Sequence, residues 1–172
     1  DNYAEWGRRG GWSSSSGRGW ANLSNAPFRM YKRYTHEGGV ATPLIVHWPA
    51  GVKGKGALRH APSHLIDIAP TCLAAAGLEG RGMEGESLLP VFAKDQKQQR
   101  TLFWEHEGNR AVRKGDYKLV AMHNTPWELY DMSKDRSELK DLSSAMPKKT
   151  EELRSAYEAW AKRVGAKSWD EV

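Results

Sequence analysis

A short apolar run, Leu44-Ile-Val-His-Trp48, constrains the fold most strongly, because Pro43 and Pro49 bound it on both sides. Proline cannot donate a ladder hydrogen bond, so the two prolines limit a strand to the residues between them. A continuous apolar run of this kind is typical of a strand that is covered on both faces of a sheet. We therefore expect a central strand over residues 44–48 and an α/β context.

A helix is expected after this strand. Asp67 can cap a helix that begins at Ile68, and Pro70 is tolerated in its first turn because that N–H has no intrahelical partner. The helical pattern runs to Ala76 and ends at Gly77, a favourable residue just after a helix. The sequence from residue 44 to residue 77 thus predicts one strand–helix unit.

The flanking segments have different patterns. Residues 1–25 are rich in glycine and serine without a helical or strand period, which predicts a long surface loop. The charged stretch 94–100 marks a boundary, so we expect one part over residues 1–90 and a second part over residues 100–172. In the second part, short apolar runs with turns between them predict an antiparallel meander; the runs are 101–105, 110–113, 117–121 and 127–130.

The C-terminal segment predicts a helix over residues 148–164. Leu153, Tyr157, Trp160 and Val164 fall on one face at helical spacing. We expect this face to pack on the sheet of the meander.

Charge and cysteine content exclude several classes of partner. The chain has 26 basic and 21 acidic residues, a net charge of +5, and its basic excess lies mostly in residues 8–33 and 53–59. This distribution does not favour nucleic acid and fits an anionic small molecule better. The single cysteine, Cys72, excludes an intrachain disulfide and a thiolate metal cluster, and its apolar neighbours predict a buried structural thiol. We expect no membrane partner, because no apolar run is long enough to span a bilayer and no signal peptide is visible.

One stretch gathers the groups that can bind an anion. Arg29, Lys32, Arg33 and His36 lie within eight residues and are followed by the glycine pair at Gly38. Cationic donors, a turn with little side-chain bulk and a rigid element behind it are what an anion pocket wall needs. By composition alone, this wall is compatible with any anion.

Catalytic motifs are incomplete in the chain. The tripeptide His-Glu-Gly occurs at His36 and at His106, but a zinc-protease helix needs a second histidine four residues later, where the chain has Val40 and Arg110. The glycine pairs lack the spacing of a dinucleotide or phosphate loop. We therefore expect the chain by itself to hold no complete catalytic constellation.

An ordered series of motifs, however, resembles the C-terminal part of the sulfatase family, close to its arylsulfatase branch. The series covers almost the whole chain from about residue 19, and its order is more specific than any single motif. It consists of Arg29-Met-Tyr-Lys32-x4-Glu37-Gly-Gly-Val-x-Thr-Pro-Leu-Ile-Val, His64-Leu-Ile-Asp67-Ile-Ala-Pro-Thr, Arg110-Ala-Val-Arg-Lys-Gly-Asp-Tyr-Lys-Leu and Trp127-Glu-Leu-Tyr-Asp131.

The resemblance implies an α/β fold, namely the C-terminal part of an alkaline-phosphatase-like sulfatase fold, whose last strand lies at residues 44–48. A small antiparallel sheet with a packed C-terminal helix follows. It also implies a sulfuric ester hydrolase that uses a formylglycine nucleophile beside a divalent metal, usually calcium. The nucleophile motif Cys/Ser-x-Pro-x-Arg does not occur in these residues. The implied partners are therefore a sulfate ester substrate and a missing N-terminal catalytic half, in a periplasmic or extracellular protein.

The resemblance also assigns site residues. Lys32 stands where the family places a lysine that binds the sulfate group and assists catalysis. Asp1 and Asn2 resemble the family's metal-binding Asp-Asn pair, although this chain has Tyr3 where the family has glycine. His36 and His106 fall at the implied mouth of the site and are predicted to bind substrate, with a structural hydrogen bond as the alternative for both. Arg29 is predicted to be an ion-pair partner.

Two other functions remain open on the sequence. A non-catalytic fragment could bind sulfated or anionic glycans through Arg29, Lys32, Arg33 and the tryptophan-rich loop in residues 1–25. A phosphoesterase of the same superfamily would share the fold.

Overall fold

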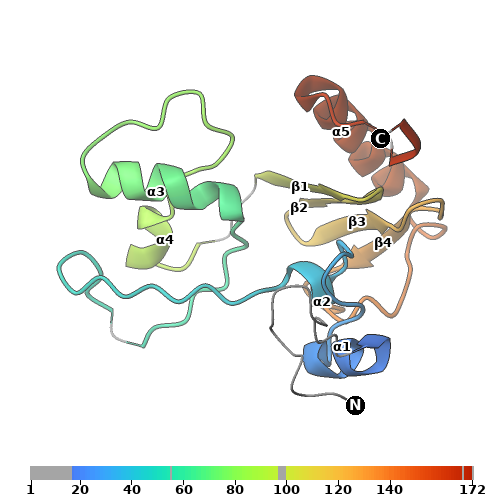
Figure 1. Cartoon of the computed structure of the whole chain (residues 1–172), viewed down its shortest axis with the longest axis horizontal. Helices are drawn as coiled ribbons and strands as arrows, with labels where there is room; N and C mark the ends of the chain where they lie inside the picture. Colours follow the sequence, from blue (N-terminus) through green and yellow to red (C-terminus); the bar gives the residue numbers. More distant parts are fainter. Residues whose placement is uncertain (1–16, 55, 97–99, 168, 172) are drawn as a thin grey trace, which may run out of the picture. The chain divides into compact units, whose positions relative to one another are not determined.

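The computed structural model describes residues 17–54, 56–96, 100–167 and 169–171 (Figure 1). The chain divides into two compact units, which are described separately. The first unit is built from Asp1–Thr42, Phe103–Val112 and Asp116–Val172, and the second from Pro43–Leu102 and Arg113–Gly115. The division into parts over residues 1–90 and 100–172 stays a prediction.

A four-stranded sheet forms the centre of the first unit. Its order is β1-β2-β3-β4, with two-residue turns between β1 and β2 and between β2 and β3. Such short turns join antiparallel strands, and β3 pairs with β4 in antiparallel register. The predicted meander is therefore confirmed; its strands are β1 (Thr101–His106), β2 (Asn109–Lys114), β3 (Tyr117–Ala121) and β4 (Glu128–Asp131).

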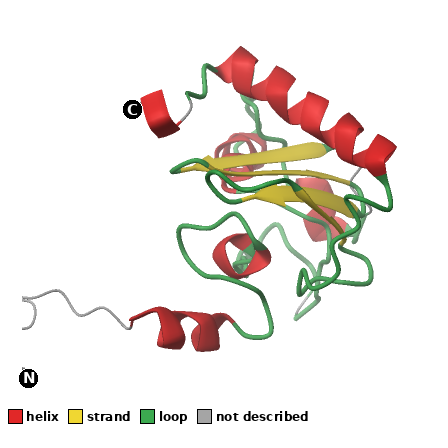
Figure 2. Ribbon diagram, turned by 90° about the vertical axis from the view of Figure 1, so that its right-hand side faces the viewer, coloured by secondary structure: helices red, strands yellow, loops and turns green. Residues whose placement is uncertain are grey.

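Helix α5 (Pro147–Val164) covers one face of this sheet (Figure 2). Leu119 and Leu129, which are register partners on β3 and β4, pack there against Leu153 and Tyr157 of the helix. Gly165 ends the helix in the left-handed conformation that favours glycine. The predicted C-terminal helix and its packing are confirmed, although Val164 at the helix end is exposed.

The opposite face of the sheet is different, because successive strand residues point to opposite sides. Lys118 faces Tyr130 across the β3–β4 ladder, and Val120 faces Glu128. This face, called the charged face below, thus carries a lysine, a glutamate and a tyrosine beside apolar residues. Short helix α2 (Glu37–Val40) lies on this side in Figure 1.

The second unit contains α3 (Ile68–Ala75), α4 (Leu89–Ala93) and the 3₁₀ turn η2 (Leu65–Asp67). The predicted helix is confirmed within one residue of each end, but Asp67 does not cap it with its side chain. The Asp67 carboxylate instead accepts hydrogen bonds from the backbone N–H groups of His64 and Glu86 and pairs with Arg100. The carboxylate therefore ties three segments of this unit together.

The expectation of a central strand at residues 44–48 is wrong for this chain. These residues form no strand, and the Ile45 side chain is 89% exposed. A strand needs a neighbour for its backbone hydrogen bonds, and the sheet of the described residues consists of β1 to β4 alone. The apolar side chains of this run are instead exposed, among them Leu44 and Val46.

Two smaller expectations also fail. Cys72 is exposed rather than buried, because the α3 side that carries it has no covering element among the described residues. Residues 17–25, expected to be loop, form helix α1 (Gly17–Asn25), in which the Asn22 and Ser24 side chains bond to carbonyls one turn earlier. The rest of that predicted loop, residues 1–16, lies outside the described residues. Over the part of the chain that is described, none of the helices has the length and apolar character needed to cross a membrane.

Candidate functional site

The cationic stretch forms a turn, here named the Lys32 turn and defined as residues 29–37, which leads into α2. Lys32 is exposed on it. The Tyr34 N–H donates to the Tyr31 carbonyl over 3.1 Å and closes the backbone around Lys32. Met30 and Arg33, on either side, have positive φ angles of 66° and 98°. Such angles cost non-glycine residues about 1–3 kcal/mol each, so the surrounding contacts must hold this conformation.

The glycine pair explains how the turn closes over the helix. The Gly38 N–H donates to the Arg29 carbonyl over 2.8 Å, so the backbone of the turn lies directly on α2. A Cβ atom on Gly38 would overlap the carbonyl oxygens of Arg29 and Met30, and one on Gly39 would overlap that of Tyr34. Only glycine leaves room for this approach of backbone to backbone.

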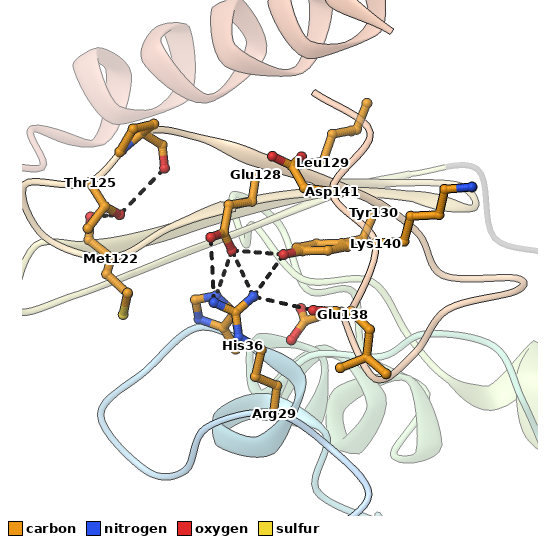
Figure 3. A network of polar contacts seen from close by, with 12 residues as sticks. Arg29, His36, Met122, Thr125, Glu128, Leu129, Tyr130, Glu138, Lys140 and Asp141 are labelled. Carbon is orange, nitrogen blue, oxygen red and sulfur yellow. Dashed lines mark hydrogen bonds and ion pairs between the residues drawn. The ribbon is translucent and has the colours of Figure 1, made fainter. Parts of the chain in front are cut away.

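Arg29 joins the turn to the charged face (Figure 3). Its Nη1 lies 2.9 Å from Glu128 Oε2 and 2.8 Å from the Tyr130 hydroxyl, and it donates to the Glu138 carbonyl over 3.3 Å. The Tyr130 hydroxyl in turn donates to Glu128 over 2.9 Å. Burial raises the pKa of Glu128, but hydrogen bonds from Arg29 and Tyr130 outweigh it and hold that pKa below its ordinary value. The prediction that Arg29 is an ion-pair partner is confirmed.

His36, near the end of the Lys32 turn, is buried and only 1% exposed. Its Nε2 is 3.4 Å from Glu128 Oε2, in the same cluster as Arg29 (Figure 3). Burial and the positive charges of Arg29 and Lys118 lower the pKa of His36 to about 4. The ring is therefore neutral at neutral pH and serves as a hydrogen-bonding support in this structure. Its contact with substrate stays a prediction.

A second buried cluster holds the end of the turn. Lys118 Nζ, on β3, lies 3.0 Å from Glu37 Oε1 and 2.8 Å from Glu138 Oε1. The Glu37 N–H donates to Glu138 Oε2 over 2.8 Å, and Arg136 reaches Glu37 Oε2 over 3.1 Å. Lys118 is fully buried, so its charge is stable there only because the two carboxylates face it.

The pKa values of the two carboxyl groups in this cluster are shifted in opposite directions. Burial raises the pKa of Glu37, but Lys118 and Arg136 together hold it below its ordinary value. Burial dominates at Glu138, and the pKa of that carboxyl is raised. The cluster thus keeps one firmly ionised carboxylate at the N-terminus of α2, next to the Lys32 turn.

His106 ends β1 and is exposed, next to the β1–β2 turn. The Asn109 side chain donates to the His106 carbonyl and to the Arg33 carbonyl, and Arg33 also pairs with Glu107. The structure therefore brings the backbone at His106 next to the Lys32 turn. A joint role of Lys32 and His106 in substrate binding stays a prediction.

Sequence reasoning missed the residues that support the turn, namely Lys118, Glu128, Glu138 and Asn109. One signal was available at Lys118, because a lysine between Tyr117 and Leu119 interrupts an otherwise apolar strand. The long-range pairs themselves join residues about 80 to 100 positions apart, and no local pattern encodes them.

The predicted metal ligands Asp1 and Asn2 lie outside the described residues. Across residues 17–171, taken without their undescribed positions, no three histidine, cysteine, aspartate or glutamate side chains gather as a metal site would require.

A family model for the C-terminal region of N-sulphoglucosamine sulphohydrolase matches residues 28–162. An uncharacterized sulfatase of Schizosaccharomyces pombe is 32% identical over 78% of this chain and 27% of its own length. The N-acetylgalactosamine-6-sulfatase of Mus musculus is 34% identical over 65% of this chain and 22% of its own length. The chain therefore spans about a quarter of the length of these curated relatives.

Solved structures agree on the fold. The crystal structure of Ps i-CgsB is similar with a TM-score of 0.69 and 25% identity, over 79% of this chain and 32% of that one. A structure from work on glycosaminoglycan metabolism by Bacteroides thetaiotaomicron gives a TM-score of 0.66 over 78% of this chain and 32% of that one; at 22% identity it supports the fold alone. The family model covers most of the chain and includes the Lys32 turn, the sheet and nearly all of α5, and on this ground the chain belongs to the sulfatase family, of which it represents the C-terminal part.

Proposed function

We propose that this chain is the C-terminal part of a sulfuric ester hydrolase and that Lys32 binds the sulfate group of its substrate. The observation that carries the proposal is the construction of the Lys32 turn. An exposed lysine stands on a turn whose neighbours Arg29, His36 and Glu37 are tied into buried clusters. A flexible surface lysine would not need such support, whereas a binding group must be held in place.

The chemistry suits a lysine. Its ammonium group offers three hydrogen-bond donors to sulfate oxygens. It also stabilises the negative charge that grows on the leaving oxygen when the ester bond breaks. His106, exposed at the adjacent hairpin, is proposed to contact the same substrate, as is His36, whose ring also anchors the turn to Glu128.

The remaining parts of the mechanism come from the family resemblance. A formylglycine would supply the nucleophile and a divalent metal, proposed to be calcium, would polarise the sulfate. Asp1 and Asn2 are proposed as two oxygen ligands of that metal. Localisation in the periplasm or outside the cell is proposed on the same resemblance.

The test is hydrolysis of 4-nitrophenyl sulfate and of N-acetylgalactosamine 6-sulfate by the naturally produced protein. The second substrate is chosen because the mouse relative is named as an N-acetylgalactosamine-6-sulfatase. Lys32→Ala should lower kcat/KM at least about 100-fold, the usual cost of removing a donor to a developing oxyanion. Lys148→Ala, which removes an exposed lysine from the first turn of α5, should leave it unchanged. Absence of sulfate-ester hydrolysis by the wild-type protein would contradict the proposal.

The second unit supports the presence of a covering partner. Large apolar side chains are exposed along residues 44–48 and around α3; they include Leu44, Ile45, Leu65, Ile66 and Leu78. We propose that the catalytic part of the sulfatase covers them, since apolar surfaces of this extent mark interaction sites. The isolated 172-residue chain should therefore aggregate or oligomerise in light scattering. A monodisperse monomer would contradict this.

A further inference from the structure

The Asn109 side chain joins three separate segments of the first unit. It is 3% exposed at the start of β2. Its Nδ2 donates to the carbonyls of Arg33 over 3.3 Å, of His106 over 3.0 Å and of Glu107 over 3.5 Å. Its Oδ1 accepts from the His123 N–H over 3.3 Å. One buried carboxamide thus bonds the Lys32 turn, the β1–β2 turn and the segment after β3.

The contact with Arg33 goes beyond the needs of the hairpin. Bonds to His106 and Glu107 are local and would close the β1–β2 turn by themselves. The bond to Arg33 spans 76 positions of the sequence and reaches the residue directly after Lys32. The ion pair of Arg33 with Glu107 joins the same two segments, but its arginine side chain is 60% exposed, and exposed pairs contribute little. Asn109 is therefore the buried link between the hairpin and the Lys32 turn.

Backbone conformation on both sides of this link requires support. Arg33 has a φ of 98°, and Glu107, across the link, has a φ of 51°. Neither is glycine, so each adopts an angle that L-residues rarely take. Asn109 bonds to the carbonyl of both. Strained residues that persist in this way are held by their surroundings and cluster at functional sites.

We propose that Asn109 is a positioning residue, which locks the Lys32 turn onto the β1–β2 hairpin so that Lys32 and His106 address one sulfated substrate. Asn109 itself touches no substrate and acts through the backbone of Arg33. The inference rests on the proposed function for its catalytic consequence, but its structural consequence is independent of any activity.

Two substitutions at Asn109 test whether its hydrogen bond to Arg33 positions the Lys32 turn or whether the residue only supports the fold. Asn109→Ala removes all four hydrogen bonds. Asn109→Asp has nearly the same shape and keeps an acceptor for the His123 N–H, but its ionised carboxylate cannot donate to the carbonyls of Arg33 and His106. The matched control is Asn22→Ala, which removes an exposed asparagine of α1 that bonds only one turn back, to Arg18.

The first arm is amide hydrogen exchange in the naturally produced protein. In both Asn109 variants, exchange at Tyr34 and Gly38, whose N–H groups donate to carbonyls of the Lys32 turn, should rise at least about tenfold relative to amides of β3 and β4. Asn22→Ala should not change it. A uniform rise over the sheet would give Asn109 a role in the fold alone, and no rise at Tyr34 and Gly38 would show that it does not hold the turn. Either result would overturn the proposal.

The second arm is steady-state hydrolysis of 4-nitrophenyl sulfate. A misplaced Lys32 should raise KM about tenfold or more in both variants and lower kcat by a smaller factor, because a displaced donor binds substrate poorly but is still present. Unchanged KM, in a protein whose activity depends on Lys32, would overturn the inference and leave the proposed function standing. If the wild-type protein hydrolyses no sulfate ester, the proposed function fails, and the exchange arm alone decides whether Asn109 holds the turn.

Discussion

The two faces of the sheet are built on opposite principles. The face under α5 is apolar, with Leu119 and Leu129 packed on Leu153, and Phe103 stacked on Trp160 at a centroid distance of 5.0 Å. The charged face carries Lys118, Glu128 and Tyr130, which pair with residues of the Lys32 turn and of the loop after β4. Residues adjacent in sequence, such as Lys118 and Leu119, thus belong to different environments.

The two faces therefore contribute differently: the apolar face mainly stabilises the fold, and the charged face mainly fixes the position of the turn. Apolar burial stabilises in proportion to area and tolerates many arrangements. Buried ion pairs contribute little net stability, because desolvation offsets the attraction, but they are satisfied in only a few arrangements. On this comparison, α5 holds the sheet together, and the charged face fixes where the Lys32 turn lies. The predictions below test that separation, from the largest expected effect to the smallest.

Lys118→Met should have the largest effect on stability. It leaves Glu37 and Glu138 buried without their shared cation, and breaking a buried pair in this way costs about 3–5 kcal/mol. The deficit should shrink as the pH falls from 7 to 4.5, because burial without the lysine raises the pKa of these carboxyl groups and they take up protons in the folded variant. Urea unfolding followed by tryptophan fluorescence at pH 7 and pH 4.5 measures both. A deficit that does not depend on pH would show that the methionine merely packs badly.

Leu119→Ala tests the apolar face under α5, at the residue that follows Lys118 in the sequence. It removes a fully buried side chain beneath α5 and should cost about 2–5 kcal/mol, with no dependence on pH between 5 and 8. At a temperature where the variant is folded, KM for 4-nitrophenyl sulfate should stay within about twofold of the wild-type value, because the Lys32 turn does not contact this face. The same urea titration and a kinetic assay provide the two measurements. A large rise in KM would contradict the claim that the charged face, and not the apolar face, positions the Lys32 turn.

Burial of the neutral His36 ring should make the free energy of unfolding fall on acidification, by less than the loss expected for Lys118→Met. Its pKa of about 4 in the folded protein lies below the ordinary 6.5, so the unfolded chain takes up the proton first as the pH falls. The stability from the neutral ring is present above pH 6.5 and is lost as the pH falls through 4. The shift corresponds to about 3 kcal/mol. In His36→Gln this contribution should be absent, so the wild-type and variant curves of unfolding free energy against pH should converge between pH 6.5 and 4. Parallel curves would contradict the burial of a neutral ring.

The elements with local patterns were predictable from the sequence. The alternation in residues 101–131 and the helical spacing of Leu153 and Tyr157 are set by burial on one side, so the meander and its helix were found correctly. The strand predicted at residues 44–48 was wrong, because that prediction also rested on an apolar pattern alone. An apolar pattern shows which residues favour burial, but it does not show whether a neighbouring strand is present to pair with them.

The candidate site was predictable only in part. Lys32 was identified by the family resemblance, and the glycine pair was recognised in the sequence as a turn with little side-chain bulk. The close carbonyl oxygens that make glycine necessary there are visible only in the structure. Lys118 and Asn109 act through partners 81 and 76 positions away. Such contacts form only when the sheet is assembled, so no local sequence period reveals them.

The most direct test of the account replaces the charges of the Lys118 cluster together. In Glu37→Gln/Lys118→Met/Glu138→Gln, no buried carboxylate is left without its cation, so the free energy of unfolding should return to within about 1–2 kcal/mol of the wild-type value. The Lys32 turn nevertheless loses the ion pairs at Glu37, and kcat/KM for 4-nitrophenyl sulfate should remain at least about tenfold below wild type. A triple variant that is both stable and fully active would contradict the claim that the charged face positions Lys32.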